Sequence, residues 1–174
     1  MSQALILIDL QVDFGAPDGA MGRQGRDVTA AQAALVKAQA LTQAARTAGV
    51  PVIFVQLIGD QLCVAGTRGA DFIGPQPQAG EHIVTKSRFC AFAGTDLATH
   101  LRAQGIGMVV LAGLTTECCV ASTAWAAFEE GFKVVIAADA CAAYEEDLHH
   151  VTLKALSLSE AGIADSAAIA AGWK

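Results

Sequence analysis

Apolar residues along this chain gather into short, nearly unbroken runs that are rich in Val, Ile and Leu. Such runs recur five times, over residues 4–10, 52–58, 83–86, 108–112 and 133–138. Runs of this length and composition are typical of parallel strands that are buried on both faces of a sheet. We therefore predict five core strands, the first of which covers Ala4–Leu10.

The stretches between these runs carry apolar residues at spacings of three and four, which indicates amphipathic helices. We predict helices over about 28–48, 96–104, 115–130 and 146–158. Residues 59–81 are rich in glycine and proline and are predicted to form a loop. A short edge strand is predicted near Ala167–Ala170.

The alternation of strands and helices predicts right-handed crossovers and a three-layer α/β/α fold around a mostly parallel, Rossmann-like sheet of six strands. No linker, internal repeat or low-complexity segment divides the sequence, so we expect residues 1–174 to form a single domain.

Composition narrows the class of protein. The apolar fraction of 53% is high, but no run approaches the roughly 18 consecutive apolar residues of a membrane helix, and we see no signal sequence. We attribute the excess to a covered sheet and a subunit interface, and expect a homo-oligomer, either a dimer or a tetramer. The net charge of −6 without a basic run argues against nucleic acid. Five cysteines without a disulfide spacing indicate a reducing, cytoplasmic location without membrane association.

Candidate chemistry lies first in residues 113–120, which read Gly-Leu-Thr-Thr-Glu-Cys-Cys-Val between the fourth predicted strand and a helical pattern. Thr115 or Thr116 is expected to cap the helix, because a hydroxyl there accepts hydrogen bonds from the free N–H groups of the first turn. Cys119 would lie in that turn, where the positive end of the helix lowers the pKa of a thiol. The alternative is that Cys118 and Cys119 are small residues packed in the interior.

Two charged residues end other predicted strands. Asp9 follows a strongly apolar run, where a carboxylate is costly unless it is paired or lies beside a cleft; the alternative is that it turns the chain together with Asp13. Lys86 ends the third predicted strand, and by composition alone it would be an ordinary solvated lysine. Neither segment assigns a role by itself.

Taken together, the three segments resemble motifs of the isochorismatase-like cysteine hydrolase superfamily. Four motifs match in family order, over residues 8–14, 86–97, 113–127 and 134–140. The resemblance covers nearly the whole chain and implies the strand order 3-2-1-4-5-6. That order places Asp9 and Cys119 at the point where it reverses, which is where open α/β sheets bind ligands.

By this resemblance the catalytic triad consists of Asp9, Lys86 and Cys119. Cys119 is chosen over Cys118 because the nucleophile of the family directly precedes a valine. The implied chemistry is attack by the Cys119 thiolate on a carbonyl, proton transfer by Asp9 and hydrolysis of the resulting thioester by water. Lys86 would favour the charged forms of Asp9 and of the Cys119 thiol.

The resemblance also implies an oxyanion hole and a class of substrate. The backbone N–H groups of Thr115 and Cys119 are its candidate donors, and the family has a cis peptide bond at Leu114–Thr115. Nicotinamidases of the family bind a metal through histidines, but residues 55–62 contain none, so we expect no metal and no cofactor. The cysteine favours C–N bond hydrolysis, which leaves small amides, ureides and carbamoyl compounds as substrates.

Three further residues are candidate substrate contacts: Phe14, Arg88 and Phe89. Core or interface packing is the alternative for the aromatic residues, and a structural ion pair is the alternative for the arginine. The alternative function is a thiol-based redox or small-molecule-binding protein on the same fold that uses the adjacent Cys118 and Cys119. Neighbouring helical residues differ by about 100° around the axis, so only one thiol should face the site.

Overall fold

Six parallel strands form the central sheet of the computed structural model, which describes residues 2–173. The strands are β1 (Ser2–Ile8), β2 (Val52–Leu57), β3 (His82–Lys86), β4 (Ile106–Leu114), β5 (Lys133–Ala142) and β6 (Gly162–Ala164). Their order is β3-β2-β1-β4-β5-β6, and every neighbouring pair is parallel. The predicted fold class and strand order are confirmed.

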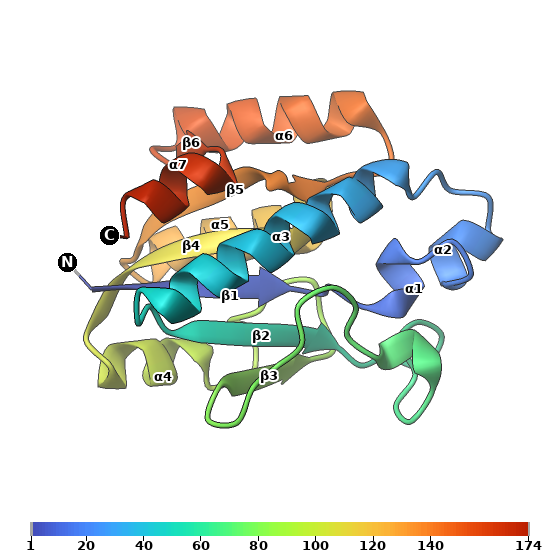
Figure 1. Ribbon diagram of the computed structural model, residues 1–174, viewed down its shortest axis with the longest axis horizontal. Coiled ribbons are helices and arrows are strands. Elements are labelled where there is room, and N and C mark those ends of the chain that lie inside the picture. Colours follow the sequence, from blue (N-terminus) through green and yellow to red (C-terminus); the bar gives the residue numbers. More distant parts are fainter. Residues whose placement is uncertain (1, 174) are drawn as a thin grey trace.

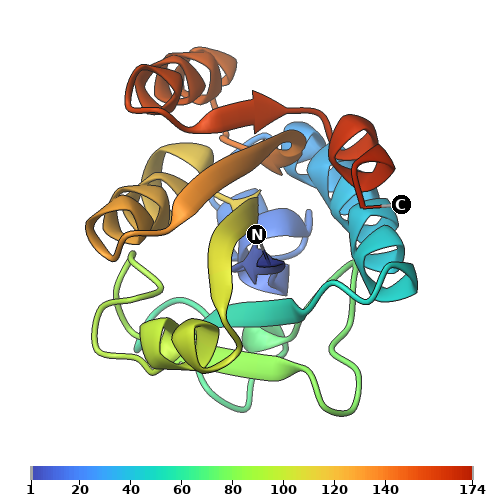
Figure 2. The same cartoon turned by 90° about the vertical axis from the view of Figure 1, so that its left-hand side faces the viewer.

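Five longer helices cover the two faces of the sheet, as the end-on view of Figure 2 shows. On one face lie α3 (Thr29–Thr47) and α7 (Ser166–Ala171), and on the other lie α4 (Leu97–Ala103), α5 (Ala121–Glu129) and α6 (Glu146–Leu158). Successive residues of β1 alternate between the two cores, so the apolar run is buried on both sides.

Several short segments gather at the carboxyl ends of the strands (Figure 1), where the helices α1 (Val12–Gly15) and α2 (Ala20–Arg23) follow β1. The buried Asp13 carboxylate fixes this region, because its oxygens accept hydrogen bonds from the N–H groups of Ala20 (2.9 Å) and Cys63 (2.8 Å). Asp13 therefore fastens the long loop after β2 over this edge of the sheet.

The predicted edge strand near Ala167–Ala170 is wrong. The edge strand is β6, which ends one residue before α7 begins, and the predicted segment lies within α7 itself. Alanines at four of the six positions of α7 favour a helix. Ser166 starts it, donating its N–H (2.6 Å) and its hydroxyl (2.9 Å) to the carboxylate of Asp139.

The ends of β1 and β4 approach each other unusually closely at Gly113, which pairs with Ile8. Gly113 has a φ of +144°, and a Cβ atom there would lie only 2.1 Å from the carbonyl oxygen of Ile8. Only glycine fits this position. The residues that follow these two strands, Asp9 and the turn before Cys119, are thereby held side by side.

Candidate active site

Asp9 is the first residue after β1, and its backbone has a φ of +51° in the left-handed region. This conformation is uncommon for residues other than glycine and is found most often where neighbouring structure enforces it. It ends the strand two residues earlier than predicted. The Asp9 N–H still donates to the Val55 carbonyl of β2 (2.9 Å), and its side chain is completely buried.

Gln11 holds the turn after Asp9 in place. Its amide nitrogen donates to the carbonyl oxygens of Leu57 and Ala70, both at 2.9 Å, and its amide oxygen accepts from the Leu57 N–H at 2.8 Å. No role for this residue was predicted from the sequence. An uncharged polar residue directly after a buried strand was the available signal, because such a group needs buried partners.

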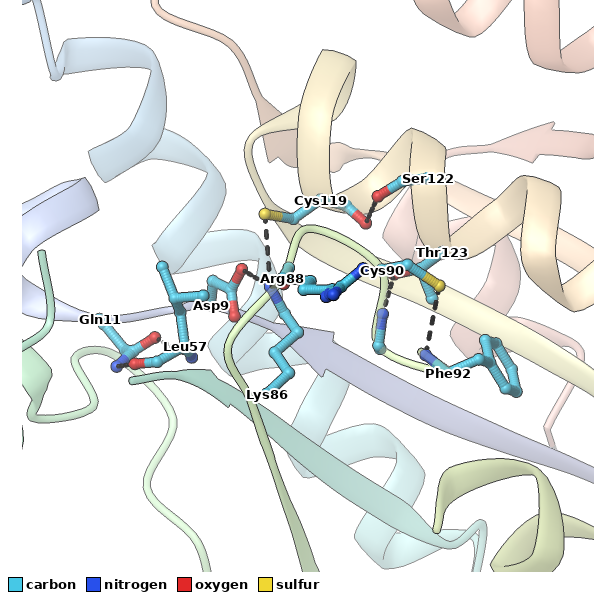
Figure 3. A network of polar contacts seen from close by, with 11 residues as sticks. Asp9, Gln11, Leu57, Lys86, Arg88, Cys90, Phe92, Cys119, Ser122 and Thr123 are labelled. Carbon is cyan, nitrogen blue, oxygen red and sulfur yellow. Dashed lines mark hydrogen bonds and ion pairs between the residues drawn. The ribbon is translucent and has the colours of Figure 1, made fainter. Parts of the chain in front are cut away.

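Lys86 is the last residue of β3, and its ammonium lies between the other two predicted triad residues (Figure 3). Its Nζ atom donates to Asp9 Oδ2 (2.7 Å), to the Arg88 carbonyl (2.9 Å) and to Cys119 Sγ (3.4 Å). The side chain is buried rather than solvated. Three strands thus bring the predicted triad together at one edge of the sheet.

Cys119 lies in a π-helical turn, η2 (Thr116–Val120), that leads directly into α5. Single π turns inside helices often occur at functional sites. Cys119 is 5% exposed, whereas Cys118 is exposed, so the two thiols face different surroundings, as the helical offset predicts. All five cysteines of the chain are free.

The predicted threonine cap is wrong for this turn. Thr115 occupies the cap position, but its hydroxyl donates to Glu117 Oε1 (3.0 Å) and makes no capping bond within residues 2–173. Its carbonyl oxygen instead accepts from the N–H groups of both Cys118 and Val120. The hydroxyl of Thr116 pairs with His149 Nδ1 (2.8 Å) on α6. Both threonine hydroxyls are therefore engaged with other side chains instead of capping the turn.

Burial dominates the electrostatics of the site. It raises the pKa of Asp9, and the positive charge of Lys86 opposes this shift. Burial and then the negative charge of Asp9 raise the pKa of the Cys119 thiol, with Lys86 opposing again. The expectation that the helix end and Lys86 leave this thiol with a lowered pKa is therefore wrong, because desolvation outweighs both effects. The resting site pairs a thiol with a neighbouring base.

Two backbone features complete this edge. The peptide bond between Leu114 and Thr115 is cis, as the family resemblance implies. Thr115 and Cys119 are both nearly buried and belong to the same turn, so their N–H groups stay the candidates for oxyanion donors. The Oδ1 atom of Asp9 is buried without a hydrogen-bond partner among the described residues.

The other predicted contacts are placed less directly. A cavity of about 500 Å³ is lined by Lys86 and Arg88, which fits a substrate contact for the exposed arginine. Phe14 packs partly buried against the core under α3, and its carbonyl accepts from the Tyr144 hydroxyl (2.8 Å). Phe89 is 65% exposed on the loop after β3, which suits an interface better than a pocket wall.

Within residues 2–173, no three His, Cys, Asp or Glu side chains are grouped as a metal site would require. None of the helices in the same part of the chain combines the length and the apolar character needed to cross a membrane.

Comparison with known proteins gives matches along most of the chain. A family model described as the isochorismatase domain matches residues 3–168. An uncharacterised isochorismatase family protein, PncA of Bacillus subtilis, is 36% identical over 172 residues, which cover 86% of this chain and 91% of the relative. The ureidoacrylate amidohydrolase RutB of Stutzerimonas stutzeri is 31% identical over 171 residues, 79% of this chain and 68% of the relative.

Solved structures give the same result. An isochorismatase-like hydrolase from Alkaliphilus metalliredigens superposes with a TM-score of 0.90 at 30% identity, over 100% of both chains. The nicotinamidase PncA from Bacillus subtilis gives 0.84 at 30% identity, over 95% of this chain and 100% of the other. The N-carbamoylsarcosine amidase from Thermoplasma acidophilum gives 0.81 at 25% identity, over 95% and 97%.

Proposed function

Because this chain belongs to the isochorismatase family, we propose that it is a cysteine-dependent hydrolase that cleaves a C–N bond of a small amide, ureide or carbamoyl compound. One observation carries the proposal: the Lys86 ammonium contacts both the Asp9 carboxylate and the Cys119 sulfur in a buried site. Relatives named as an amidohydrolase and an amidase support the choice of a C–N bond. Residues 1–174 act as one hydrolase domain in this proposal.

The first half-reaction forms a thioester. The Cys119 sulfur attacks the substrate carbonyl carbon while Asp9 accepts the thiol proton, for which its Oδ1 atom, without a hydrogen-bond partner among residues 2–173, is available. Burial raises the pKa of Asp9, so its carboxylate is a stronger base than a solvated aspartate and its protonated form persists at higher pH. That proton then passes to the leaving nitrogen, and ammonia or an amine departs.

The second half-reaction restores the enzyme. Asp9 takes a proton from water as the water oxygen attacks the thioester carbonyl, and the sulfur leaves as a thiolate that then recovers this proton from Asp9. The Lys86 ammonium stabilises negative charge on Asp9 and on the departing sulfur. The N–H groups of Thr115 and Cys119 donate to the tetrahedral oxyanion in both steps.

A turnover screen tests this function. Ureides, carbamoyl amino acids, simple amides and nicotinamide are each incubated with the enzyme, and released ammonia or amine is measured. We expect turnover of at least one ureide, carbamoyl compound or small amide, and its loss in Cys119→Ala. Nicotinamide is included because a structural neighbour is named as a nicotinamidase. We expect it not to be the preferred substrate, because residues 55–62 lack the histidines by which nicotinamidases of the family bind a metal, and preferential nicotinamide turnover would overturn that expectation. If none of these classes is hydrolysed, the proposed function is wrong.

We also propose that the protein is a cytoplasmic homo-oligomer. Helix α6 supports the formation of an oligomer, because it buries only Leu156. Four of its other apolar residues are exposed: Leu148, Val151, Ala155 and Leu158. These four residues, which we call the α6 stripe, follow the three–four spacing of a coiled-coil seam. Contact of these apolar side chains with water is energetically unfavourable, and an identical stripe on a second copy of the chain would bury them.

A further inference from the structure

Thr123 links two parts of the site that are 32 residues apart in the sequence. It lies on α5, four residues after Cys119, and is completely buried. Its hydroxyl oxygen accepts a hydrogen bond of 3.0 Å from the backbone N–H of Ala91, which is also buried (Figure 3). Ala91 belongs to the loop that follows β3, five residues after Lys86. The nucleophile helix and the lysine loop are thus joined by a side chain.

This hydroxyl is used differently from the hydroxyls of two other helical threonines. Thr42 and Thr47 of α3 donate to carbonyl groups four residues earlier in their own helix, at 2.7 and 2.9 Å. The other buried residues of α5 are alanines, which leaves Thr123 as the polar member of that set. A buried backbone N–H needs an acceptor, and Thr123 supplies one for Ala91 across the gap between two elements.

The loop held in this way also holds the lysine. The Arg88 carbonyl, three residues before Ala91, accepts from Lys86 Nζ at 2.9 Å. Next to Ala91 the loop is closed further, because the Thr95 hydroxyl donates to the Ala91 carbonyl at 2.6 Å. Two hydrogen bonds, from Ala91 to Thr123 and from Lys86 to Arg88, therefore connect α5 through the loop to the ammonium that lies 3.4 Å from Cys119 Sγ.

We propose that Thr123 is a positioning residue, whose hydroxyl fastens the loop after β3 to the nucleophile helix and so sets the separation between Lys86 Nζ and Cys119 Sγ. The proposal rests on the proposed function for the roles of Lys86 and Cys119. It predicts that loss of the hydroxyl affects the reactivity of the thiol and the chemical step more than the binding of substrate.

The test compares Thr123→Val, which keeps the shape and removes the acceptor, with Thr123→Ser, which keeps the hydroxyl. Thr42→Val is the matched control, because Thr42 is an equally buried helical threonine that bonds only within α3. The rate at which iodoacetamide alkylates Cys119 is followed by peptide mass spectrometry as a function of pH. For active substrates, kcat and KM are measured separately.

In Thr123→Val we expect the alkylation profile of Cys119 to move to higher pH by about one unit, which is about a tenfold lower rate at a fixed pH on its rising limb. The reason is that a displaced Lys86 lowers the pKa of the thiol less. We expect kcat to fall about tenfold with KM nearly unchanged, and Thr123→Ser and Thr42→Val to stay close to wild type.

An unchanged alkylation profile in Thr123→Val would overturn the proposal, as would an equal loss in Thr42→Val or no recovery in Thr123→Ser. If valine prevents folding, Thr123→Ala removes the same acceptor with a smaller side chain and gives the same comparison with serine. Alkylation needs no substrate, so this test decides the role of Thr123 even if the turnover screen rejects the proposed function.

Discussion

The Lys86 ammonium lies 2.7 Å from the Oδ2 atom of Asp9, and both side chains are completely shielded from solvent. These residues are 77 positions apart and meet because β1 and β3 end at the same edge of the sheet. A buried ion pair contributes little net stability, but removal of one partner leaves an uncompensated charge in the interior. The pair therefore makes the site sensitive to single substitutions.

Lys86→Met should lower the free energy of unfolding by about 3–5 kcal/mol, because Asp9 is left buried without its counter-charge. The double variant Asp9→Asn/Lys86→Met, which removes both charges, should be destabilised by clearly less than the sum of the single variants. Urea denaturation of the four proteins measures this coupling. Additive losses would show that the two side chains do not form an ion pair in the folded protein.

The two adjacent cysteines should behave differently. Cys119→Ala should abolish turnover, because it removes the sulfur that lies against Lys86, while Cys118→Ala, at an exposed position, should keep activity near wild type. Steady-state kinetics and circular dichroism of both variants check this together with folding. An inactive Cys118→Ala beside an active Cys119→Ala would reverse the assignment.

Much of the fold follows from local sequence. Residues 4–8 are all apolar, as expected for a strand that is buried on both faces, and this pattern identified β1 as a central strand. The alanine-rich segment at 167–170 has no such distinctive apolar pattern, and the start of its helix is fixed by Asp139, which is 27 residues from Ser166. A pattern of neighbouring residues does not reveal contacts between residues so far apart in the sequence.

The site was predictable in its members but not in its protonation. Asp9 and Cys119 follow neighbouring parallel strands, so topology alone brings them together, whereas the place of Lys86 rested on the family resemblance. The state of the thiol depends on how completely the folded chain excludes water from it. Helix-end arguments omit that desolvation. The hydrogen bond from the Ala91 N–H to the Thr123 hydroxyl could not be predicted either, because the two residues are 32 positions apart in the sequence.

Activity should decline in acid at a higher pH than a free aspartate would give. Burial raises the pKa of Asp9 above its ordinary value of 3.8, and only the ionised carboxylate accepts the thiol proton, so kcat/KM falls as pH falls through the raised pKa.

The same shift means that the folded chain binds this proton more tightly than the unfolded chain, so the contribution of Asp9 to stability declines as pH rises from 3.8 through the folded pKa.

A pH profile of kcat/KM with a good substrate checks the acid limb. Asp18→Asn is the matched control, because Asp18 is exposed and Arg68 holds its pKa below the usual range, so the profile should not change. An acid limb at or below pH 3.8 would contradict the raised pKa of Asp9.

The α6 stripe should control assembly. Val151 and Leu158 are 66% and 79% exposed, so Val151→Glu/Leu158→Glu should leave the fold intact and shift the protein towards monomer in sedimentation velocity. Val36→Glu places the same charge at an equally exposed valine on α3 and should not change the oligomeric state. Wild-type protein that sediments as a monomer at about 10 µM, a concentration at which stable oligomers persist, would contradict the account.

The covalent intermediate gives the most direct test of the central claim that Cys119 is the nucleophile of a hydrolase. Enzyme mixed with a limiting amount of a turned-over ureide or amide is quenched in acid during the first turnover, and its peptides are mapped by mass spectrometry. A parallel sample contains hydroxylamine, which intercepts a thioester as a hydroxamate. We predict one acyl group, located on Cys119, and hydroxamate formation. An acyl group on another residue, or hydrolysis with neither adduct nor hydroxamate, would contradict it.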